Sequence, residues 1–580
     1  MGTRSIFWLI AAVVALQACM AFAQSNAPER GITVVPSEPL PAEPIEPDRP
    51  AVPRATPPMP SSVDNEAVLD AYRRQLSTSS VDVKGITVTG NSVLADAEIE
   101  AVTAPYAGRS MSLEEIEALR RQLTLLYIDH GYVNSGVVLA QLPFTSAGVL
   151  QFDVVEGRLT NLELTGNRYL TDGYIERRLK RKLGPVLNIG EIEQSLRLMQ
   201  TWPTIAAVNA EVLPGSAPGT GVLDLQIREN NPVTLAFGAD NHRSPSVGEN
   251  QGVVSLTHRS LTHHGDYLIA NYGVADGLDN LYVAYGLPLT AADLTFEGHY
   301  SEGTSDIVEA PFDTLDIVSD TESYGGRLFR PMIKTLTQLL TLSLEFEHKK
   351  SRSTLLGVPF SFSPGEVDGG SRVSALRAGL DWSRRWTRDA IATRLKVSKG
   401  VDWLDATDNS ALPGNLPDSD FTAVLLQAEY AHQFDWRNAQ LLGRITAQGT
   451  DDPLLPVEKL AVGGGRTVRG YRENLLVRDE GVIASIEARV PLFPDDAGAS
   501  RIGLSIAPFV DYGVARDRLD SLPSAESQDL LSAGAGLLWN PWRPLHVEIY
   551  YGHRFEDVDD AGDGLQDDGV HFRVTFGWSF

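Results

Sequence analysis

The last eleven residues of the chain alternate between two kinds of side chain. One set is small or polar. The other is apolar and largely aromatic, and it comprises Val570, Phe572, Val574, Phe576, Trp578 and Phe580. Because successive side chains of a strand point to opposite faces, this pattern predicts a strand with one continuous apolar face. Aromatic residues on such a face are typical of strands that contact lipid near the membrane boundary.

The region from residue 231 onward breaks into further alternating segments of about ten residues, the strand signal of an outer-membrane barrel. Its connections alternate in length: 435–438 and 540–544 are short, whereas 451–480 and 556–569 are long. Barrel strands run up and down between short periplasmic turns and long outer loops. We therefore expect an antiparallel transmembrane β-barrel of about sixteen strands, with both ends at the periplasm.

Composition excludes several other classes of protein. The chain has 49 Lys and Arg against 75 Asp and Glu, a net charge of −26, which argues against a nucleic-acid partner because phosphate binding relies on cations. A single cysteine rules out a disulfide framework within one chain. Beyond residue 23, no apolar run reaches the ~18 residues of a spanning helix, so a helical-bundle membrane protein is excluded.

The N-terminal residues 1–23 are predicted to be a signal peptide. Arg4 gives a positive start, an apolar run follows, and residues 21–23 form a small-x-small cleavage site. The alternative is a lipoprotein signal, with Cys19 in a loose lipobox. On the first interpretation, the mature chain has no cysteine.

Two segments of different character follow. Residues 24–62 are rich in proline and lack aromatic residues, as expected of an extended linker. Residues 63–80 carry Val68, Leu69 and Tyr72 at helical spacing behind Asp64, a candidate N-cap. This segment is either a lead-in helix or a pore plug.

An internal repeat occupies the next 150 residues. The tripeptide T-G-N at 89–91 returns at 165–167, an offset of 76 residues, which is a domain-sized period. Each copy, 81–157 and 158–230, has the pattern β-α-α-β-β. Both modules offer edge strands to which an extended peptide can add; the alternative is that they are rigid spacers.

The longest outer loop, 451–480, holds the most distinctive motif of the barrel. It contains the run G-G-G-R-T-V-R-G-Y, which ends in Val468, Arg469, Gly470 and Tyr471. Glycines allow tight reversals, so this loop is able to fold back on itself. If it folds into the lumen, Arg469 needs an anionic partner, because an unpaired buried charge is very unfavourable.

Strand alternation supplies two candidate partners. In 482–490 the apolar residues form one row, which leaves Ser485, Glu487 and Arg489 on the lumen side. In 502–512 the same argument places Phe509 and Asp511 in the lumen. A guanidinium paired with such a carboxylate would hold the loop inside the pore. On the residues alone, an arginine exposed in an outer loop stays open as the alternative.

No catalytic, cofactor or metal site is expected. A cluster of aspartates near the C-terminus lacks the ligand spacing of a calcium loop, and we interpret it as part of a solvated outer loop: Asp559, Asp560, Asp563, Asp567 and Asp568. Three histidines without nearby carboxylates at ligand spacing are interpreted as turn residues: His258, His263 and His264. A phosphate-binding P-loop sequence is also absent.

Several motifs together resemble a known family. The V-R-G-Y of 468–471, the G-x-x-x-x-x-E-x-R of 481–489, the F-x-D-x-G of 509–513 and the terminal Phe580 resemble signatures of two-partner secretion transporters, the hemolysin secretion/activation family. The segments N-S-V-L-A-D-A-E-I, A-P-Y-A-G-R and Y-I-D-H-G-Y-V-N-S-G resemble that family's first periplasmic POTRA domain. The resemblance covers residues 81–580.

This resemblance implies two POTRA domains, 81–157 and 158–230, followed by a sixteen-stranded outer-membrane barrel, 231–580. It implies that Arg469 pairs with Asp511 in the lumen, next to Glu487, Phe509 and Gly513. It also implies that an N-terminal helix plugs the pore at rest, a role for which 64–76 is the candidate here. The C-terminal Phe576, Trp578 and Phe580 would form the signal for barrel assembly.

The expected function is export without catalysis. An unfolded β-helical exoprotein would dock on a POTRA edge, pass through the barrel and fold outside. Other expected partners are outer-membrane lipid, the barrel assembly machinery and periplasmic chaperones, and the transporter is expected to be a monomer without cofactors. Two alternatives are an outer-membrane protein insertase of the same superfamily, which usually carries more POTRA copies, and a passive porin.

Overall fold

The computed structural model describes residues 81–140, 148–494, 502–519, 523–542, 544–556, 558, 562 and 564–580. They fall into two compact units, of which the first ends at Asn230 and the second begins at Asn231. The predicted signal peptide, linker and lead-in or plug helix, residues 1–80, lie outside the described residues. None of the described helices combines the length and the apolar character needed to cross a membrane.

The first unit begins with a β-α-α-β-β module. Its elements are β2 (Gly85–Thr89), α3 (Asp96–Thr103), α4 (Leu113–Asp129), β4 (Gly136–Leu139) and β5 (Val149–Val155). Strand β5 is central and pairs in parallel with β2 and antiparallel with β4. The module also contains a small ribbon and a 3-10 turn that were not predicted from the sequence: β1 (Val81–Val83), β3 (Arg109–Met111) and η1 (Ala104–Tyr106).

Helix α4 begins at a capping box. The Ser112 hydroxyl accepts from the Glu115 backbone N–H at 3.2 Å, and the Glu115 carboxylate accepts from the Ser112 N–H at 2.8 Å. The helix ends before Gly131, whose φ of +88° is accessible to glycine at little cost. Its buried face, Ile116, Leu119, Leu123 and Tyr127, forms the centre of this module's core.

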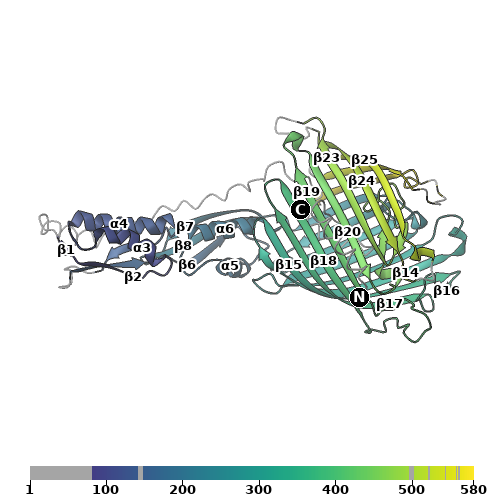
Figure 1. Ribbon diagram of the computed structural model, residues 1–580, viewed down its shortest axis with the longest axis horizontal. Helices are drawn as coiled ribbons and strands as arrows, with labels where there is room; N and C mark the ends of the chain where they lie inside the picture. The colour runs from purple at the N-terminus through teal and green to yellow at the C-terminus, as the bar shows by residue number, and fades with distance from the viewer. Residues whose placement is uncertain are drawn as a thin grey trace. The chain divides into compact units, whose positions relative to one another are not determined.

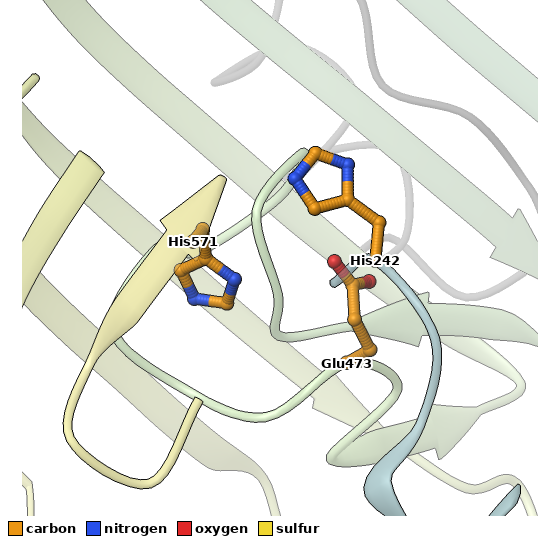
Figure 2. Close-up of side chains that lie close together, drawn as sticks. All are labelled: His242, Glu473 and His571. Atoms are coloured by element: carbon orange, nitrogen blue, oxygen red, sulfur yellow. The ribbon is translucent and has the colours of Figure 1, made fainter. Parts of the chain in front are cut away.

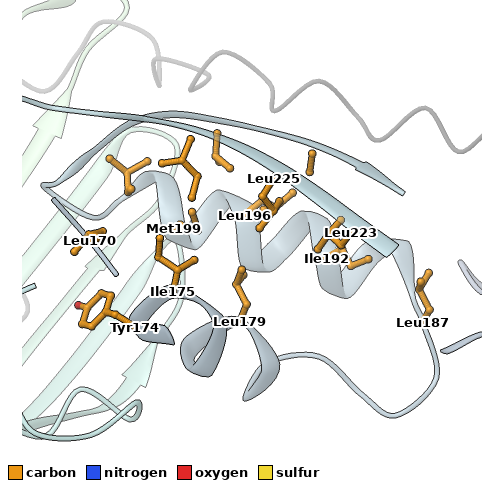
Figure 3. Packing of buried hydrophobic residues seen from close by; sticks show 14 residues of the cluster. Leu170, Tyr174, Ile175, Leu179, Leu187, Ile192, Leu196, Met199, Leu223 and Leu225 are labelled. Carbon is orange, nitrogen blue, oxygen red and sulfur yellow. The ribbon is translucent and has the colours of Figure 1, made fainter. Parts of the chain in front are cut away.

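The second module repeats the layout. Its elements are β6 (Arg158–Thr165), α5 (Asp172–Lys180), α6 (Ile189–Gln200), β7 (Ile205–Pro214) and β8 (Thr220–Glu229), with β8 between β6 and β7. Figure 3 shows that Ile175 and Leu179 of α5 and Leu196 and Met199 of α6 point into one core beneath β8. Leu196 and Met199 are fully buried, so the two helices cover one face of the sheet.

The repeated T-G-N turn has one physical cause in both modules. Gly90 and Gly166 have φ of +83° and +87° and lie directly against the last strand of their own module. A Cβ on Gly90 would lie 2.6 Å from the carbonyl oxygen of Val154, and one on Gly166 would collide with that of Ile227. Only glycine satisfies both the backbone angle and the close approach.

The second unit is a closed antiparallel barrel (Figure 1). Its sixteen long strands are β9 (Val233–Asp240), β10 (Gln251–Arg259), β11 (Tyr267–Ala275), β12 (Leu278–Pro288), β13 (Thr295–Asp306), β14 (Ile317–Lys334), β15 (Gln338–Leu355), β17 (Gly370–Arg385), β18 (Asp389–Val401), β19 (Thr422–Gln433), β20 (Gln440–Thr450), β23 (Glu480–Pro491), β24 (Leu504–Arg516), β25 (Gln528–Trp542), β26 (Leu545–Arg554) and β27 (Val570–Ser579). A two-residue strand, β16 (Val358–Pro359), adds to the end of β15. The predicted fold is therefore confirmed.

The first and last strands close the ring. Strand β27 pairs antiparallel with β9, from Arg573 opposite Asp240 to Ser579 opposite Thr234. Trp578 and Phe580 are more than half exposed on the outer side of the barrel, where lipid would cover them. His571, on the opposite face of β27, is fully buried. The predicted alternation of this strand thus separates a lipid face from a lumen face.

The connections include five described 3-10 turns, η2 (Pro245–Val247), η3 (Asp313–Leu315), η4 (Trp436–Asn438), η5 (Pro456–Glu458) and η6 (Pro523–Ala525). His263 and His264 lie in the turn between β10 and β11, as predicted. The interpretation of His258 as a turn residue is wrong, because it lies in β10 opposite Leu268 of β11. Only a strand-long count of alternation would have placed it there.

Candidate functional site

The long connection between β20 and β23 has a fold of its own inside the barrel wall. It contains a two-stranded sheet of β21 (Leu460–Val462) and β22 (Leu476–Arg478). Val462, Val468 and Tyr471 are fully buried and pack against inward-facing residues of the wall, Ile483 and Leu530 among them. The loop is thus a packed insert with an apolar core, and its long glycine run allows the reversals.

Arg469 lies at the centre of this insert and is only 3% exposed. Its Nε and Nη2 donate to the two carboxylate oxygens of Asp511 at 2.8 and 2.9 Å, and its backbone N–H also donates to Asp511 at 3.0 Å. Nη1 pairs with Glu487, and Nη2 donates to the Ser485 hydroxyl at 3.1 Å. A buried guanidinium with this many acceptors is fully compensated, whereas removing one partner of such a pair costs about 3–5 kcal/mol.

Two aromatic rings enclose the same guanidinium. Its central carbon lies 3.6 Å from the ring centre of Phe509 and 4.7 Å from that of Tyr550. The two rings also meet edge to face at 5.9 Å. Arginine stacks on aromatic faces while its edges donate hydrogen bonds, so lysine could not reproduce this set of contacts.

The remaining motif residues have steric roles. Gly470 has φ of +95°, and a Cβ there would lie 2.7 Å from the carbonyl oxygen of Gly552. Tyr471 donates from its hydroxyl to the carbonyl of Leu531 at 2.9 Å. At Gly513, a Cβ would lie 2.5 Å from Cγ1 of Val462 and 2.8 Å from Cγ2 of Val468. Gly513 therefore leaves the space into which the insert packs.

The structure brings together all the lumen residues that the sequence singled out, on three neighbouring elements. Val468 to Tyr471 come from the insert, Glu487 from β23, and Phe509, Asp511 and Gly513 from β24. Phe576, Trp578 and Phe580 are not part of this cluster. They lie at the seam between β27 and β9, where Phe576 is opposite Phe237.

A second anchor of the insert was not predicted from the sequence. Glu458, in η5, pairs with Arg377 of β17 at 2.7 Å and with Lys349 of β15 at 3.0 Å. All three side chains are largely buried, and Glu347 of β15 completes the group at 3.0 Å from Arg377. The insert is therefore tied to two separate parts of the wall. Strand alternation places Arg377 in the lumen, but the sequence gives no signal for its partner.

A third anchor corrects the interpretation of the C-terminal aspartates. Arg472 forms an ion pair with Asp567 and lies 2.9 Å from Glu309. The backbone N–H of Glu473 donates to Gln566, whose side chain is fully buried. The interpretation of Asp567 as a solvated loop residue is therefore wrong, because that loop folds onto the insert. Asp559, Asp560 and Asp563 lie outside the described residues.

His242, Glu473 and His571 lie close together between the insert and the wall, as Figure 2 shows. Their chemistry does not suit a metal ion. His571 Nε2 accepts from the Gly470 N–H at 3.1 Å, and His242 Nδ1 accepts from Arg573 at 2.9 Å. In a neutral ring the other nitrogen then carries the hydrogen, so no lone pair is left for a metal. Burial, reinforced by Arg573, keeps the pKa of His242 well below its usual range.

Comparisons with known families and proteins agree with this geometry. A family described as haemolysin secretion/activation protein ShlB/FhaC/HecB matches residues 219–538, and the POTRA domain of ShlB type matches residues 81–157. The outer membrane transporter CdiB of Dickeya dadantii is 24% identical over 398 residues, covering 68% of this chain and 69% of that protein. The hemolysin transporter protein HpmB of Proteus mirabilis is 22% identical over 418 residues, covering 70% and 71%.

Two solved structures share the fold. CdiB from Escherichia coli superposes with a TM-score of 0.63 at 21% identity, over 89% of this chain and 98% of that one. BamA from Haemophilus ducreyi lacking POTRA domains 1–3 superposes with a TM-score of 0.53 at 13% identity, over 86% and 100%.

Proposed function

Because the chain belongs to the haemolysin secretion/activation family, we propose that it exports one large, unfolded, β-helical exoprotein across the bacterial outer membrane. The barrel spans that membrane, and the two POTRA modules lie in the periplasm, where they would receive the exoprotein. No step of this process requires catalysis by the transporter.

The observation that carries the proposal is the insert held in the lumen by Arg469 and Asp511. The backbone of the insert joins the wall at the ends of β20 and β23, which pair directly with each other. The insert can therefore leave the lumen without disturbing the pairing of the barrel strands. Its polar anchors are ion pairs and hydrogen bonds, which an incoming chain and water can replace, and its apolar contacts with Ile483 and Leu530 would break as well. The wall left behind carries Glu487, Asp511 and Arg377, which suits the passage of a hydrated polypeptide.

The periplasm contains no ATP, so export across the outer membrane needs another source of free energy. Folding of the β-helical exoprotein at the cell surface would provide direction, because a folded segment cannot slide back through the pore. Biogenesis of the barrel would use the assembly machinery and periplasmic chaperones, with the aromatic residues of β27 as the signal. We further propose that the transporter acts as a monomer.

The POTRA modules offer defined docking edges. Among the described residues, β2 and β4 are each paired on one side only in the first sheet, and β6 and β7 are in the second. An extended peptide can extend such an edge by main-chain hydrogen bonds, largely independent of its sequence. This form of recognition suits a substrate that arrives unfolded.

The experiment that tests the mechanism replaces Arg469 by Ala. Secretion of the exoprotein should be lost, whereas the barrel should still insert into the membrane. Heat-modifiable migration in gels would show that the barrel is folded. Arg469→Lys should also fail, because lysine cannot bridge Asp511 and Glu487 or stack on Phe509. Arg516→Ala is the matched control: Arg516 lies on β24, half exposed, and its ion pair with Glu480 is worth about 0–1 kcal/mol. Unimpaired secretion by Arg469→Ala would contradict the role of the insert.

An insertase function is the second candidate, because BamA shares the fold. The two functions differ in what is lost when the gene is deleted. A transporter's deletion removes one exoprotein from the medium and leaves the set of outer-membrane proteins intact, whereas deletion of an insertase depletes many of them. A quantitative proteome of the outer membrane and of the medium decides between them.

A further inference from the structure

The outer face of the barrel changes character near the extracellular ends of β12 to β15. Strand β9 starts at the periplasm, so β13 and β15 run outward and end at the cell surface. Large apolar side chains are exposed on the part of this face nearer the periplasm: Phe296, Leu328, Leu342 and Leu344. Above them lie Tyr300 and Tyr324, which are exposed and directly opposite each other. Such tyrosines mark the boundary between hydrocarbon and headgroups.

The next rungs outward are charged. Strand register places Glu302 of β13 opposite Glu322 of β14, and Glu322 opposite Lys350 of β15. One step further, Asp320 lies opposite Arg352. The flanking residues of Tyr300, His299 and Ser301, are buried toward the lumen, so the alternate positions face outward. The charged groups thus face the membrane side of the wall, just beyond the aromatic boundary.

These side chains surround a hollow of about 460 Å³ on the outer face. Its lining includes two tyrosines, two cations and four carboxylates: Tyr272, Tyr300, Lys350, Arg352, Asp279, Glu302, Asp320 and Glu322. The cations are weakly engaged. Lys350 is 3.8 Å from Glu322, and among the described residues Arg352 has no ion pair. In the described part of the chain, Glu302 accepts a hydrogen bond only from the Tyr300 hydroxyl, at 2.8 Å, and it lies opposite another carboxylate. Two carboxylates directly opposite each other on neighbouring strands repel. Glu302 and Glu322 therefore favour a cation bound between them.

We propose that this hollow binds the phosphorylated headgroup of lipopolysaccharide in the outer leaflet. Lys350 and Arg352 would pair with its phosphates, as ammonium and guanidinium groups do. Glu302 and Glu322 would contact those phosphates through Mg²⁺ or Ca²⁺, hard cations that prefer oxygen ligands. Tyr272 and Tyr300 would pack beneath the sugar, at the level where the acyl chains begin.

The test uses the full chain purified in mild detergent. Lipopolysaccharide that co-purifies is quantified through its 3-hydroxy fatty acids, and the melting temperature is followed as lipid A bearing its inner sugars is added with Mg²⁺. The wild-type protein should retain the lipid and melt at a higher temperature when it is added. In Lys350→Glu/Arg352→Glu, retention should fall about fivefold for each cation removed.

Three controls keep the outcome decisive. Arg384→Glu removes an exposed, outward-facing cation at the periplasmic end of β17 and should retain the lipid like wild type. Lys350→Gln/Arg352→Gln tests the same site if charge reversal prevents barrel assembly. Chelation of Mg²⁺ should weaken retention in wild type but less in Glu302→Gln. Equal retention by the double variants, or equal stabilisation by phosphatidylglycerol, would overturn the proposal.

Discussion

Glu458 in the lumen insert and Arg377 in β17 form a two-pronged ion pair, in which the carboxylate oxygens accept from Nη1 and Nη2 at 3.0 and 2.7 Å. Arg469 anchors the same insert to β23 and β24. The insert emerges between β20 and β23, and it is therefore fixed to the wall at β17 on one side of this point and at β23 and β24 on the other. An insert with several anchors can be released at one of them while the others still limit its motion.

Replacing Glu458 by Gln should loosen the anchor on Arg377. It leaves Arg377 with Glu347 as its one carboxylate partner among the residues that the structure describes, and breaking a buried pair in this way costs about 3–5 kcal/mol. We expect more frequent and larger channel openings in planar lipid bilayers. Glu480→Gln is the matched control, since Glu480 pairs with the half-exposed Arg516. A Glu458→Gln channel as closed as wild type would show that this anchor does not restrain the insert.

Gly513→Ala should displace the insert by steric overlap. The new methyl group would lie 2.5 Å from Cγ1 of Val462, and such overpacking costs about 1–3 kcal/mol. Secretion should decrease, and protease cleavage within 451–479 should increase. Adding Val462→Ala should restore both in part, because it removes Cγ1 of Val462 but leaves Cγ2 of Val468 at 2.8 Å from the new methyl group. Gly449→Ala on β20, where a Cβ would have no neighbour within 4 Å, should behave like wild type.

Asn188→Ala should loosen the junction between the POTRA modules. The Asn188 side chain accepts from the Gly190 N–H at 2.8 Å as the N-cap of α6 and donates to the carbonyl of His130 at 3.0 Å. Loss of the cap costs about 1 kcal/mol, and amide exchange should accelerate at the start of α6. Thr201→Ala, at the other end of that helix, should leave this exchange unchanged. Identical exchange in Asn188→Ala would mean that the junction is held elsewhere.

The first POTRA module should become less stable as the pH rises from 6.5 through the folded-state pKa of His130. The carbonyl of Leu126, which accepts from His130 Nδ1 at 2.9 Å, and then Glu98, at 3.1 Å from Nε2, raise the pKa of His130 above its ordinary 6.5. A raised folded-state pKa stabilises the fold fully below pH 6.5, and this contribution is lost as the pH rises through the folded pKa.

NMR titration of His130 checks this directly. In Glu98→Gln the pKa should move back toward 6.5, and exchange at the end of α4 should depend less on pH. A pKa at or below 6.5 in the wild-type protein would refute the prediction.

The alternation of side chains along the strands predicted both the barrel and the residues that the wall contributes to the site. Ile486, Val510 and Tyr512 had to face lipid, so alternation left Glu487, Phe509 and Asp511 facing the lumen. The pairing of Arg469 with Asp511, by contrast, was implied by family resemblance, since a loop has no periodicity from which its path can be computed. Glu458 and Asp567 were missed because their roles depend entirely on that path.

The shortest strands could not be predicted from the sequence either. Strands β1 and β3 have three residues each, too few for alternation to be recognised. The T-G-N repeat was visible as a sequence match, but its cause was not: the contact of Gly90 with Val154 and of Gly166 with Ile227 joins residues far apart in the chain.

The seam between β9 and β27 has a consequence for how the barrel is made. Asn241 donates to the carbonyl of Val570, 329 positions away, so the ring cannot close until nearly all of the intervening chain has been arranged. Contacts this distant make folding slow, and until they form, β9 and β27 are both open edges able to pair with other strands. The slowest step in making this protein should therefore be the meeting of its two seam strands, and a mutation there should lower yield before it alters transport.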